Sequence, residues 1–418
     1  MKQRHTIPSR ANSIRVYALL LLLFPVAITA QDVGDMQTFG SMQAIFFNQN
    51  SQLERSVVGI PATASLGESR NSFALQQLDF FFTKQFDDAF SAFVDIEFQL
   101  NYSSEKRWGS LSIQEAWMNY SLRDEVNLKL GLLFPAFNHF NEIKNRLALQ
   151  PYIFRPLVYE RLLSTRFMTE DYIPEHAYVQ VYGSIPWGPV FADYAVYAGN
   201  SESSYITRYD ALHDIETEKN PQFEFLSGVD PNSFALKLFG GRIGVRSRDE
   251  QIKFGASLTH DANNMLRRYA SHESSISLET LSLLPDDAKR WRLGGDLSVH
   301  VSRLTLETEL INVAYDLDEA GERDLKMEQW FLYWVLGYDL TDAIYPYVSM
   351  QWGDYRFGVD ADYSLPLPGL SWRLRRAVTV KGQVVLYDER EHGVAAENME
   401  FHQDLRIIFI LFGVSVLL

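Results

Sequence analysis

The sequence predicts an all-β fold, a transmembrane antiparallel β-barrel of about sixteen strands with short turns at one end and long loops at the other. Three observations favour this class. Apolar and polar residues alternate with a period of two in many segments, and short and long connections follow each other in turn. The chain of 418 residues is 46% hydrophobic and 14% aromatic, yet only its N-terminus approaches the length of a helical membrane span.

The first thirty residues have the features of a secretory signal peptide. Basic residues without any acid come first, namely Lys2, Arg4, Arg10 and Arg15. An apolar run over 16–24 and small residues ending at Ala30 follow them. We expect residues 1–30 to be cleaved, with an uncleaved anchor as the alternative, and residues 31–418 to form the barrel. Cleavage leaves 34 Lys and Arg against 53 Asp and Glu, a formal charge of −19.

The clearest alternation lies in two neighbouring segments. Every second residue from Phe90 onward is apolar, and the residues between them are mostly polar. The segment 73–86 follows the same pattern, and only Asp87 and Asp88 separate the two. Because successive side chains of a strand point to opposite faces, these segments predict two strands joined by a tight turn.

The same pattern recurs to the end of the chain. We predict strands over 36–48, 73–86, 89–102, 110–122, 125–134, 176–186, 189–199, 234–247, 250–260, 289–302, 303–314, 329–339, 344–354, 369–375, 377–388 and 400–416. The longer connections lie at 49–71, 135–175, 200–233, 261–288, 315–328, 355–369 and 388–400. An even number of strands places both termini at the end with the short, periplasmic turns. Gly240 and Gly241 predict a bulge in the eighth strand, and Pro366 and Pro368 crowd the start of the fourteenth.

A soluble periplasmic all-β protein is the competing architecture, since its strands also alternate. Such strands usually have about 5–6 residues, whereas many of those predicted here exceed ten. In hydrocarbon, a closed sheet satisfies every backbone hydrogen-bonding group while its strands remain apolar on one face only. Strand length therefore favours a barrel that crosses a membrane.

The polar face of the predicted strands lines the lumen and carries many charges. The candidate lumen-wall residues are Asp95, Glu97, Glu115, Arg242, Arg246, Arg290, Arg292 and Arg373. A charged wall keeps a wide barrel filled with water, and segregated acids and bases set up a field across it. Simple pairing of these charges on a solvated wall is the alternative.

Residues 135–175 form a candidate constriction loop, because connections of this length usually have a function. The loop is rich in apolar residues, which folding into the lumen would bury, and an external cap is the alternative. Between residues 144 and 166 it carries one acid, Glu160, against Lys144, Arg146, Arg155, Arg161 and Arg166. Basic residues at a constriction favour anions, so these five form the candidate anion path.

Several motifs in the first half of the chain resemble those of one family. They are FFFTKQF at 80–86, DIEF at 95–98, QEAWMNY at 114–120, LGLLFPAF at 130–137, NEI at 141–143 and RPLVYE at 155–160. These resemble the phosphate-selective porin O/P family of bacterial outer-membrane porins, and the loop arrangement resembles that of the sixteen-stranded general porins. The resemblance implies a homotrimeric outer-membrane channel whose third external loop folds inward. Selective members of the family use lysine-rich constrictions, whereas this loop is rich in arginine.

We therefore predict an outer-membrane porin that lets small hydrophilic solutes or inorganic anions diffuse passively. The absence of cysteine excludes thiol and iron–sulfur chemistry, and the acidic charge disfavours nucleic acid. The sequence has no metalloprotease-type histidine pair, nucleophile elbow or P-loop, so we expect no catalytic residue, metal or cofactor. His300, flanked by Ser298 and Ser302, fits a solvated lumenal histidine better than a catalytic one. A non-conducting barrel anchor that presents acidic external loops for binding is the alternative function.

Overall fold

In the computed structural model, the described residues are 36–57, 64–101, 110–159, 172–174, 176–201, 237–263, 288–316, 327–356, 359–395 and 399–418. The predicted signal peptide lies outside them. None of the helices in these ranges is long and apolar enough to cross a membrane. The described residues are mostly strands, and three short 3-10 helices lie in the connection between the fifth and the sixth.

Sixteen strands make up the described fold, as the alternation predicts. In chain order they are β1 (Met36–Val57), β2 (Ala64–Gln85), β3 (Phe90–Asn101), β4 (Ser110–Arg123), β5 (Val126–Leu133), β6 (Ala177–Trp187), β7 (Val190–Asn200), β8 (Lys237–Ser247), β9 (Ile252–Asn263), β10 (Ala288–Val301), β11 (Leu304–Asp316), β12 (Met327–Tyr338), β13 (Ile344–Arg356), β14 (Val359–Arg375), β15 (Val378–Ala395) and β16 (Met399–Leu417). The 3-10 helices are η1 (Phe140–Glu142), η2 (Leu147–Leu149) and η3 (Leu157–Tyr159).

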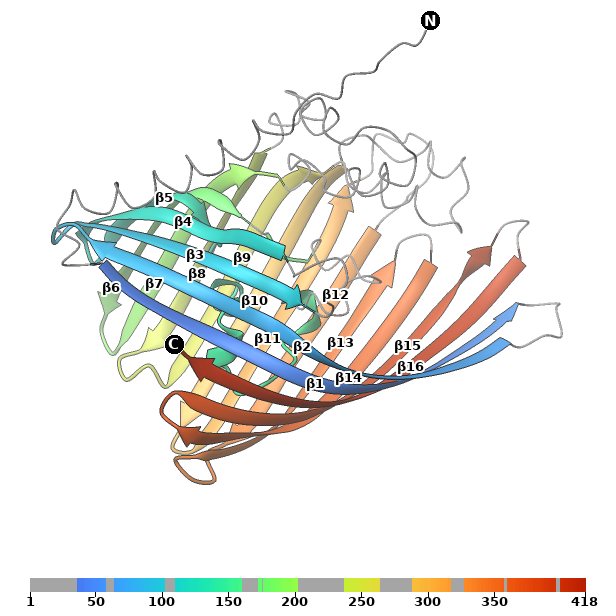
Figure 1. Cartoon of the computed structure of the whole chain (residues 1–418). Helices are drawn as coiled ribbons and strands as arrows, with labels where there is room; N and C mark the ends of the chain where they lie inside the picture. The colour runs from blue at the N-terminus through green and yellow to red at the C-terminus, as the bar shows by residue number, and fades with distance from the viewer. Residues whose placement is uncertain are drawn as a thin grey trace, which may run out of the picture.

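The strands form one closed antiparallel barrel, so the predicted fold class is confirmed (Figure 1). Each strand pairs with its neighbours in sequence, and β1 closes the ring by pairing with both β2 and β16. At one end of the barrel all seven connections, from that between β2 and β3 to that between β14 and β15, are turns of two to five residues; we call this the short-turn end. The C-terminus lies at this end beside the start of β1, where the amide of Gly40 donates to the carbonyl oxygen of Leu418 at 3.2 Å.

Three predicted long connections are wrong, because the strands continue through them. β1 extends to Val57 and β2 begins at Ala64, so most of 49–71 is strand, and 355–369 and 388–400 are also largely strand. In the extension of β1, Asn50 pairs with Ser69 of β2 and with Ile408 of β16. Most residues of this extension are polar on both faces, so the backbone ladder continues without the alternation that marks a strand crossing hydrocarbon.

Glycine and proline also have different roles from those predicted. The pairing of β8 passes through Gly240 and Gly241 without a register shift, so there is no bulge. A Cβ at Gly240 would lie 2.4 Å from a ring carbon of Tyr197, which explains the glycine as space for that ring. Pro366 and Pro368 lie inside β14, where pairing with β15 is interrupted between Ser364 and Gly369. Proline has no amide proton to donate, and the gap in the ladder accommodates it.

The inner face of the barrel differs between its two halves. From β2 to β10 it is largely polar, as predicted, but from β11 to β16 it carries a second apolar surface. We call this surface the apolar inner wall; it comprises Ile311, Val313, Tyr315, Phe331, Tyr333, Val335, Tyr347, Tyr363, Leu365, Leu367, Val385, Tyr387, Leu405, Ile407, Phe409 and Leu411. All of these side chains are buried, so something inside the barrel covers them.

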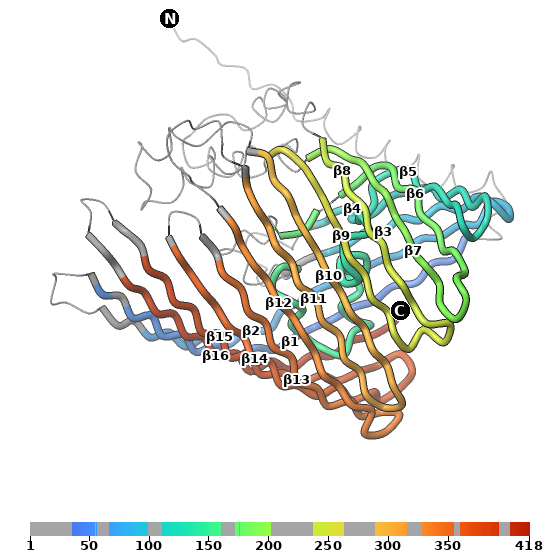
Figure 2. The backbone as a smooth tube through the Cα atoms, turned by 180° about the vertical axis from the view of Figure 1, so that it is seen from behind, coloured from blue at the N-terminus to red at the C-terminus, as the bar shows by residue number. Residues whose placement is uncertain are grey.

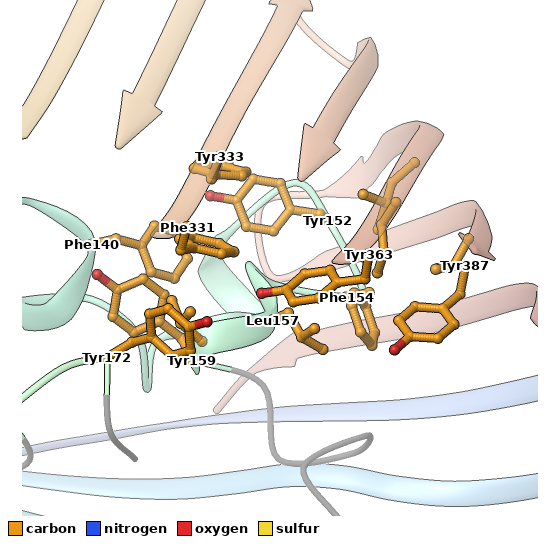
Figure 3. Close-up of a cluster of buried hydrophobic side chains, with 14 of the residues drawn as sticks. Phe140, Tyr152, Phe154, Leu157, Tyr159, Tyr172, Phe331, Tyr333, Tyr363 and Tyr387 are labelled. Atoms are coloured by element: carbon orange, nitrogen blue, oxygen red, sulfur yellow. The ribbon is translucent and has the colours of Figure 1, made fainter. Parts of the chain in front are cut away.

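The segment after β5 provides that cover. β5 ends at Leu133, Pro135 follows, and the chain turns from the wall into the barrel, where it forms η1, η2 and η3 (Figure 2). Phe140, Phe154 and Leu157 pack in one hydrophobic cluster with the apolar inner wall (Figure 3). The described part of the predicted loop, 135–159 with 172–174, thus lies inside the barrel and not over its mouth.

Candidate functional site

Side-chain amides of the barrel wall hold the backbone of the inner loop. Three glutamines accept hydrogen bonds from loop amides: Gln180 from Ala136 at 3.0 Å, Gln383 from Ile153 and Phe154 at 3.0 and 2.7 Å, and Gln351 from Leu157 at 2.6 Å. Two more donate to loop carbonyl oxygens: Gln77 to that of Asn145 at 2.7 Å and Gln76 to that of Ile153 at 3.1 Å. The strands of a closed barrel already pair with each other, so the backbone of a loop in the lumen needs other partners. A buried backbone group without a partner is costly. The glutamines meet that need from β2, β6, β13 and β15.

Other wall residues fix the two sides of the loop. Glu309 on β11 accepts hydrogen bonds from the amide of Phe140 at 2.6 Å and from the hydroxyl of Tyr159 at 2.8 Å. The amide of Asn138 donates to Ser257 on β9 at 3.0 Å. Together with the glutamine contacts, these bonds attach the loop to strands around the whole ring. The described part of the loop, 135–159 with 172–174, is therefore a fixed part of the lumen.

A cavity of about 360 Å³ remains between the loop and the wall formed by β5 to β9. Its polar and charged lining consists of Asp124, Asn127, Lys129, His139, Glu142, Gln180, Tyr182, Ser184, Asp193, Tyr194, Arg242, Arg246 and Lys253. The lining reaches Asp124 in a turn at the short-turn end, while His139 and Glu142 come from the loop. A pocket of this size accommodates a small organic solute.

Three basic side chains of the cavity are neutralised by carboxylates. Arg242 forms two hydrogen bonds with Asp296, at 2.6 and 3.2 Å. Arg246 lies 3.0 Å from a carboxylate oxygen of Asp193 and 2.8 Å from one of Glu250. Lys253 lies 3.1 Å from the other oxygen of Glu250. The two predicted lumen-wall arginines, Arg242 and Arg246, thus line the cavity as members of ion pairs.

His139 is the titratable group that the loop contributes beside these pairs. Burial lowers the pKa of its imidazole below the ordinary value of 6.5, and the cations of Arg242 and Lys253 lower it further, against the attraction of Asp296. The ring is consequently neutral at pH 7 and gains charge only in acid.

The predicted acids lie on β3 and β4, next to the cavity wall that begins at β5. Asp95 and Glu97 on β3 are buried, and Asp95 faces Glu115 of β4 across the strand pair. The loop meets this group through Asn145, whose amide donates to Glu97 at 3.5 Å, and through Arg146, which attracts Asp95 and Glu115 electrostatically. Arg146 is exposed, so its charge faces solvent and these acids.

The two other basic loop residues that the structure describes, Lys144 and Arg155, lie away from the cavity. Lys144 is buried with its ammonium group 4.3 Å from the ring centroid of Phe134, and buried Arg155 donates to the carbonyl oxygen of Lys144. Neither lines the cavity. Arg161 and Arg166 lie outside the described residues. In the described part of the loop, two of the candidate anion-path residues are thus packing residues.

The remaining lumen-wall candidates divide into a buried group and an exposed residue. Arg290 binds Asp261 through two hydrogen bonds of 2.6 and 3.0 Å, and Arg292 lies 3.4 Å from the same carboxylate, with all three side chains fully buried. Arg373 is exposed near the short-turn end. No group of three or more histidine or acidic residues in the described ranges is placed to hold a metal ion.

The sequence indicated Arg242 and Arg246 as lumen-wall residues but did not single out several others that shape this site. The wall glutamines, Lys129, His139 and Glu142 fall outside the predicted set. A usable signal existed for the glutamines, because Gln77, Gln351 and Gln383 occupy inward positions of their strands, where a long apolar loop would need polar partners. No such signal exists for Lys129 and Glu142, because only the path of the loop brings them to the same cavity.

The fold is similar to that of solved outer-membrane proteins. OmpT of Vibrio cholerae, expressed in the outer membrane, aligns with 93% of this chain and 99% of its own, with a TM-score of 0.50 and 8% identity. An anion-selective porin from Comamonas acidovorans aligns over 90% and 100% of the two chains (TM-score 0.49, 11% identity), and the outer membrane channel DcaP of Acinetobacter baumannii over 91% and 97% (TM-score 0.48, 10% identity). Neither a protein-family model nor a curated protein matches the sequence. At this identity, the alignment with OmpT shows that the chain has the fold of an outer-membrane barrel.

Proposed function

We propose that the protein is an outer-membrane porin, a passive diffusion channel for small hydrophilic solutes, and not an enzyme. The observation that carries this proposal is the charged cavity beside a loop fixed to the inner wall. The loop fills the half of the lumen that faces the apolar inner wall, and the cavity lies in the other half, among Lys129, Arg242, Arg246 and Lys253. Solutes would pass between the loop and the wall of β5 to β9.

The proposed charge preference is weak. The sequence favours anions through the five basic residues of the loop, and phosphate-like anions through the family resemblance. In the cavity, however, Arg242, Arg246 and Lys253 each have a carboxylate partner. A paired cation attracts a passing anion less than a free one, because the partner cancels most of its field. We therefore propose general permeability to small hydrophilic solutes, with any anion preference secondary.

Planar lipid bilayers test the proposal. Purified, folded protein added to one side should give stepwise current increases in potassium chloride, and a salt gradient should give a reversal potential close to zero. A strongly anion-selective reversal potential would contradict the weak preference proposed here and support the anion preference expected from the loop sequence. Folded protein that never conducts would favour the second candidate, a barrel anchor that presents its acidic external loops to partners.

Export, location and assembly are parts of the same proposal. We propose that the signal peptide at 1–30 is removed and that the barrel lies in the outer membrane as a homotrimer. Exposed apolar side chains on the outer face, among them Phe254, Leu258 and Leu293, suit contact with lipid or with a neighbouring barrel. N-terminal sequencing of protein from isolated outer membranes, and its mass in detergent by light scattering, test these points.

A further inference from the structure

Two charged side chains of the cavity, those of Lys129 and Glu142, form no direct ion pair within the described residues, although Glu115 and Arg242 attract them from a longer distance. Arg242, Arg246 and Lys253 are paired with carboxylates, as described above. In the described ranges, neither the ammonium group of Lys129 nor the carboxylate of Glu142 takes part in an ion pair, although both line the cavity. Asp124 also lines the cavity, but it lies in an exposed turn at the edge of the cavity, where water screens its carboxylate.

Aromatic rings hold the ammonium group of Lys129 in place. It lies 4.6 Å from the ring centroid of Trp117 and 5.1 Å from that of Tyr182. Contacts with ring faces stabilise a cation but accept none of its three N–H groups in the way an oxygen would. Glu115 attracts this lysine from a longer distance, while one of its own oxygens accepts from Trp117 and Phe134. Lys129 is thus a positioned cation that can donate to a ligand.

The backbone around Glu142 is fixed while its carboxylate is exposed. Its neighbour Asn141 is fully buried, and the Asn141 amide donates to the carbonyl oxygens of Pro135 and Pro174 at 2.9 and 3.3 Å. Phe140, at the start of the same 3-10 helix, is bonded to Glu309. The side chain of Glu142 therefore extends into the cavity from a fixed backbone, and its carboxylate can accept from a ligand.

Both charges border the same side chain, that of Tyr182. The Lys129 ammonium group lies over its ring, and Glu142 acts on Tyr182 electrostatically. Both side chains line the same cavity, and they form no ion pair with each other. A ligand with one charge would satisfy one of them and be repelled by the other, whereas a ligand with both would satisfy the two together.

We infer that this cavity is a binding subsite for small zwitterions, solutes that carry one carboxylate and one ammonium group, as free amino acids do. The ligand's carboxylate accepts from Lys129, and its ammonium group donates to Glu142. This inference rests on the proposed channel function and specifies one class of solute for it. A solute that binds within a channel slows the ion current through it, so binding is measurable as a loss of current.

Three matched probes test the assignment: L-glutamine with both charges, N-acetyl-L-glutamine with the carboxylate only, and L-glutaminamide with the ammonium group only. At pH 7 in planar bilayers, we expect L-glutamine to halve the current at a concentration about 10-fold lower than either single-charge probe, since each added charge contact is worth about this factor. Equal potency of the three probes would overturn the inference and leave the channel function intact.

Two substitutions separate the contacts. Lys129→Met should remove the advantage of L-glutamine over L-glutaminamide, and Glu142→Gln its advantage over N-acetyl-L-glutamine. Lys84→Met is the matched control, because the Lys84 ammonium group also lies over an aromatic ring, at 5.6 Å from that of Phe86, but outside the cavity. If both cavity variants keep the full preference of the unmodified protein, the assignment is wrong.

A second readout keeps the inference testable when no current is seen. Titration calorimetry of the folded barrel in detergent, with the same probes and variants, measures binding without conduction. Absence of current together with selective binding of L-glutamine would contradict the channel and support the subsite. Current without selective binding would support the channel and contradict the subsite.

Discussion

Lys381 on β15 and Gln43 on β1 meet inside the barrel, with the Nζ atom of Lys381 2.6 Å from Oε1 of Gln43. The same ammonium group donates to the carbonyl oxygens of Leu147 and Tyr152 in the loop, at 3.1 and 3.4 Å. Lys381 is 1% exposed and Gln43 is 0% exposed, so no water can replace these bonds. One buried lysine therefore joins the barrel wall to two points of the loop.

Substitution of this lysine should loosen the loop. Lys381→Met leaves two buried carbonyl oxygens without their donor, at a cost of about 1–3 kcal/mol for an unsatisfied group. Amides of residues 147–153 should then exchange their protons about 5- to 150-fold faster in the folded barrel. Hydrogen exchange followed by mass spectrometry measures this, with exposed Lys289→Met as the control. Unchanged exchange in Lys381→Met would show that the contact does not hold the loop.

The apolar contact between loop and wall should stabilise the whole barrel. Leu157 is 0% exposed in the cluster with the apolar inner wall, whereas Leu149 in the same loop is 54% exposed. Leu157→Ala should lower the free energy of unfolding by about 2–5 kcal/mol, the usual range for a buried leucine. Leu149→Ala should change it by less than about 0.5 kcal/mol. Urea unfolding in lipid vesicles compares the two, and similar losses for both would contradict the packing described here.

The buried charges of Arg290, Arg292 and Asp261 should be sensitive to loss of the acid. Asp261→Asn leaves two fully buried guanidinium groups beside a neutral amide, and breaking such a pair costs about 3–5 kcal/mol. Asp360→Asn is the matched control, because its carboxylate is exposed and lies 3.7 Å from His392. The same urea titration should show a large shift for the first variant only.

Release of Arg242 from its partner should change ion selectivity. Asp296→Asn removes the carboxylate that binds Arg242 directly and so increases the net positive charge of the cavity. The reversal potential in a salt gradient should move toward anion preference, and Asp342→Asn in an exposed turn should leave it unchanged. A shift toward cations in Asp296→Asn would be incompatible with a conducting path beside Arg242.

His139 should make both stability and selectivity depend on pH. Because the folded state lowers the pKa of His139 below 6.5, the unfolded chain binds its proton first as the pH falls. The contribution of His139 to stability is complete above pH 6.5 and is lost as the pH falls from there toward the lower folded pKa. The proton bound in acid also adds a positive charge to the cavity and should favour anions. His139→Gln should reduce both effects, as measured by urea midpoints and reversal potentials between pH 5 and 7.5.

The sequence predicted the existence of every strand but not the length of each. In β3, Phe90, Val94 and Ile96 face outward and Asp95 and Glu97 inward, and this contrast is visible in the sequence. In the extensions of β1, β2 and β15 beyond the predicted bounds, both faces are mostly polar. The alternation of apolar and polar residues reflects the different environments of the two faces of a strand. It therefore ends where both faces contact water.

The contents of the lumen were the main feature that alternation could not predict. Trp330, Leu332 and Trp334 of β12 face outward, but Phe331 and Tyr333 between them face inward and are buried. A continuous apolar run in a barrel strand means that each face has an apolar neighbour, lipid outside and the loop inside. Similarly, the sequence pattern assigns Arg242 and Arg290 to the inner face. Their pairing with Asp296 and Asp261, however, depends on the register between neighbouring strands.

Cysteine accessibility tests the central claim, a water-filled path between the loop and the wall of β5 to β9. The protein has no cysteine, so a single one can be introduced without interference. With Glu142→Cys in planar bilayers, a charged, water-soluble methanethiosulfonate reagent should reduce the current irreversibly, whereas Leu157→Cys, which is buried against the apolar inner wall, should be insensitive. Current that is unaffected by the reagent in Glu142→Cys, or that falls equally in Leu157→Cys, would contradict this path.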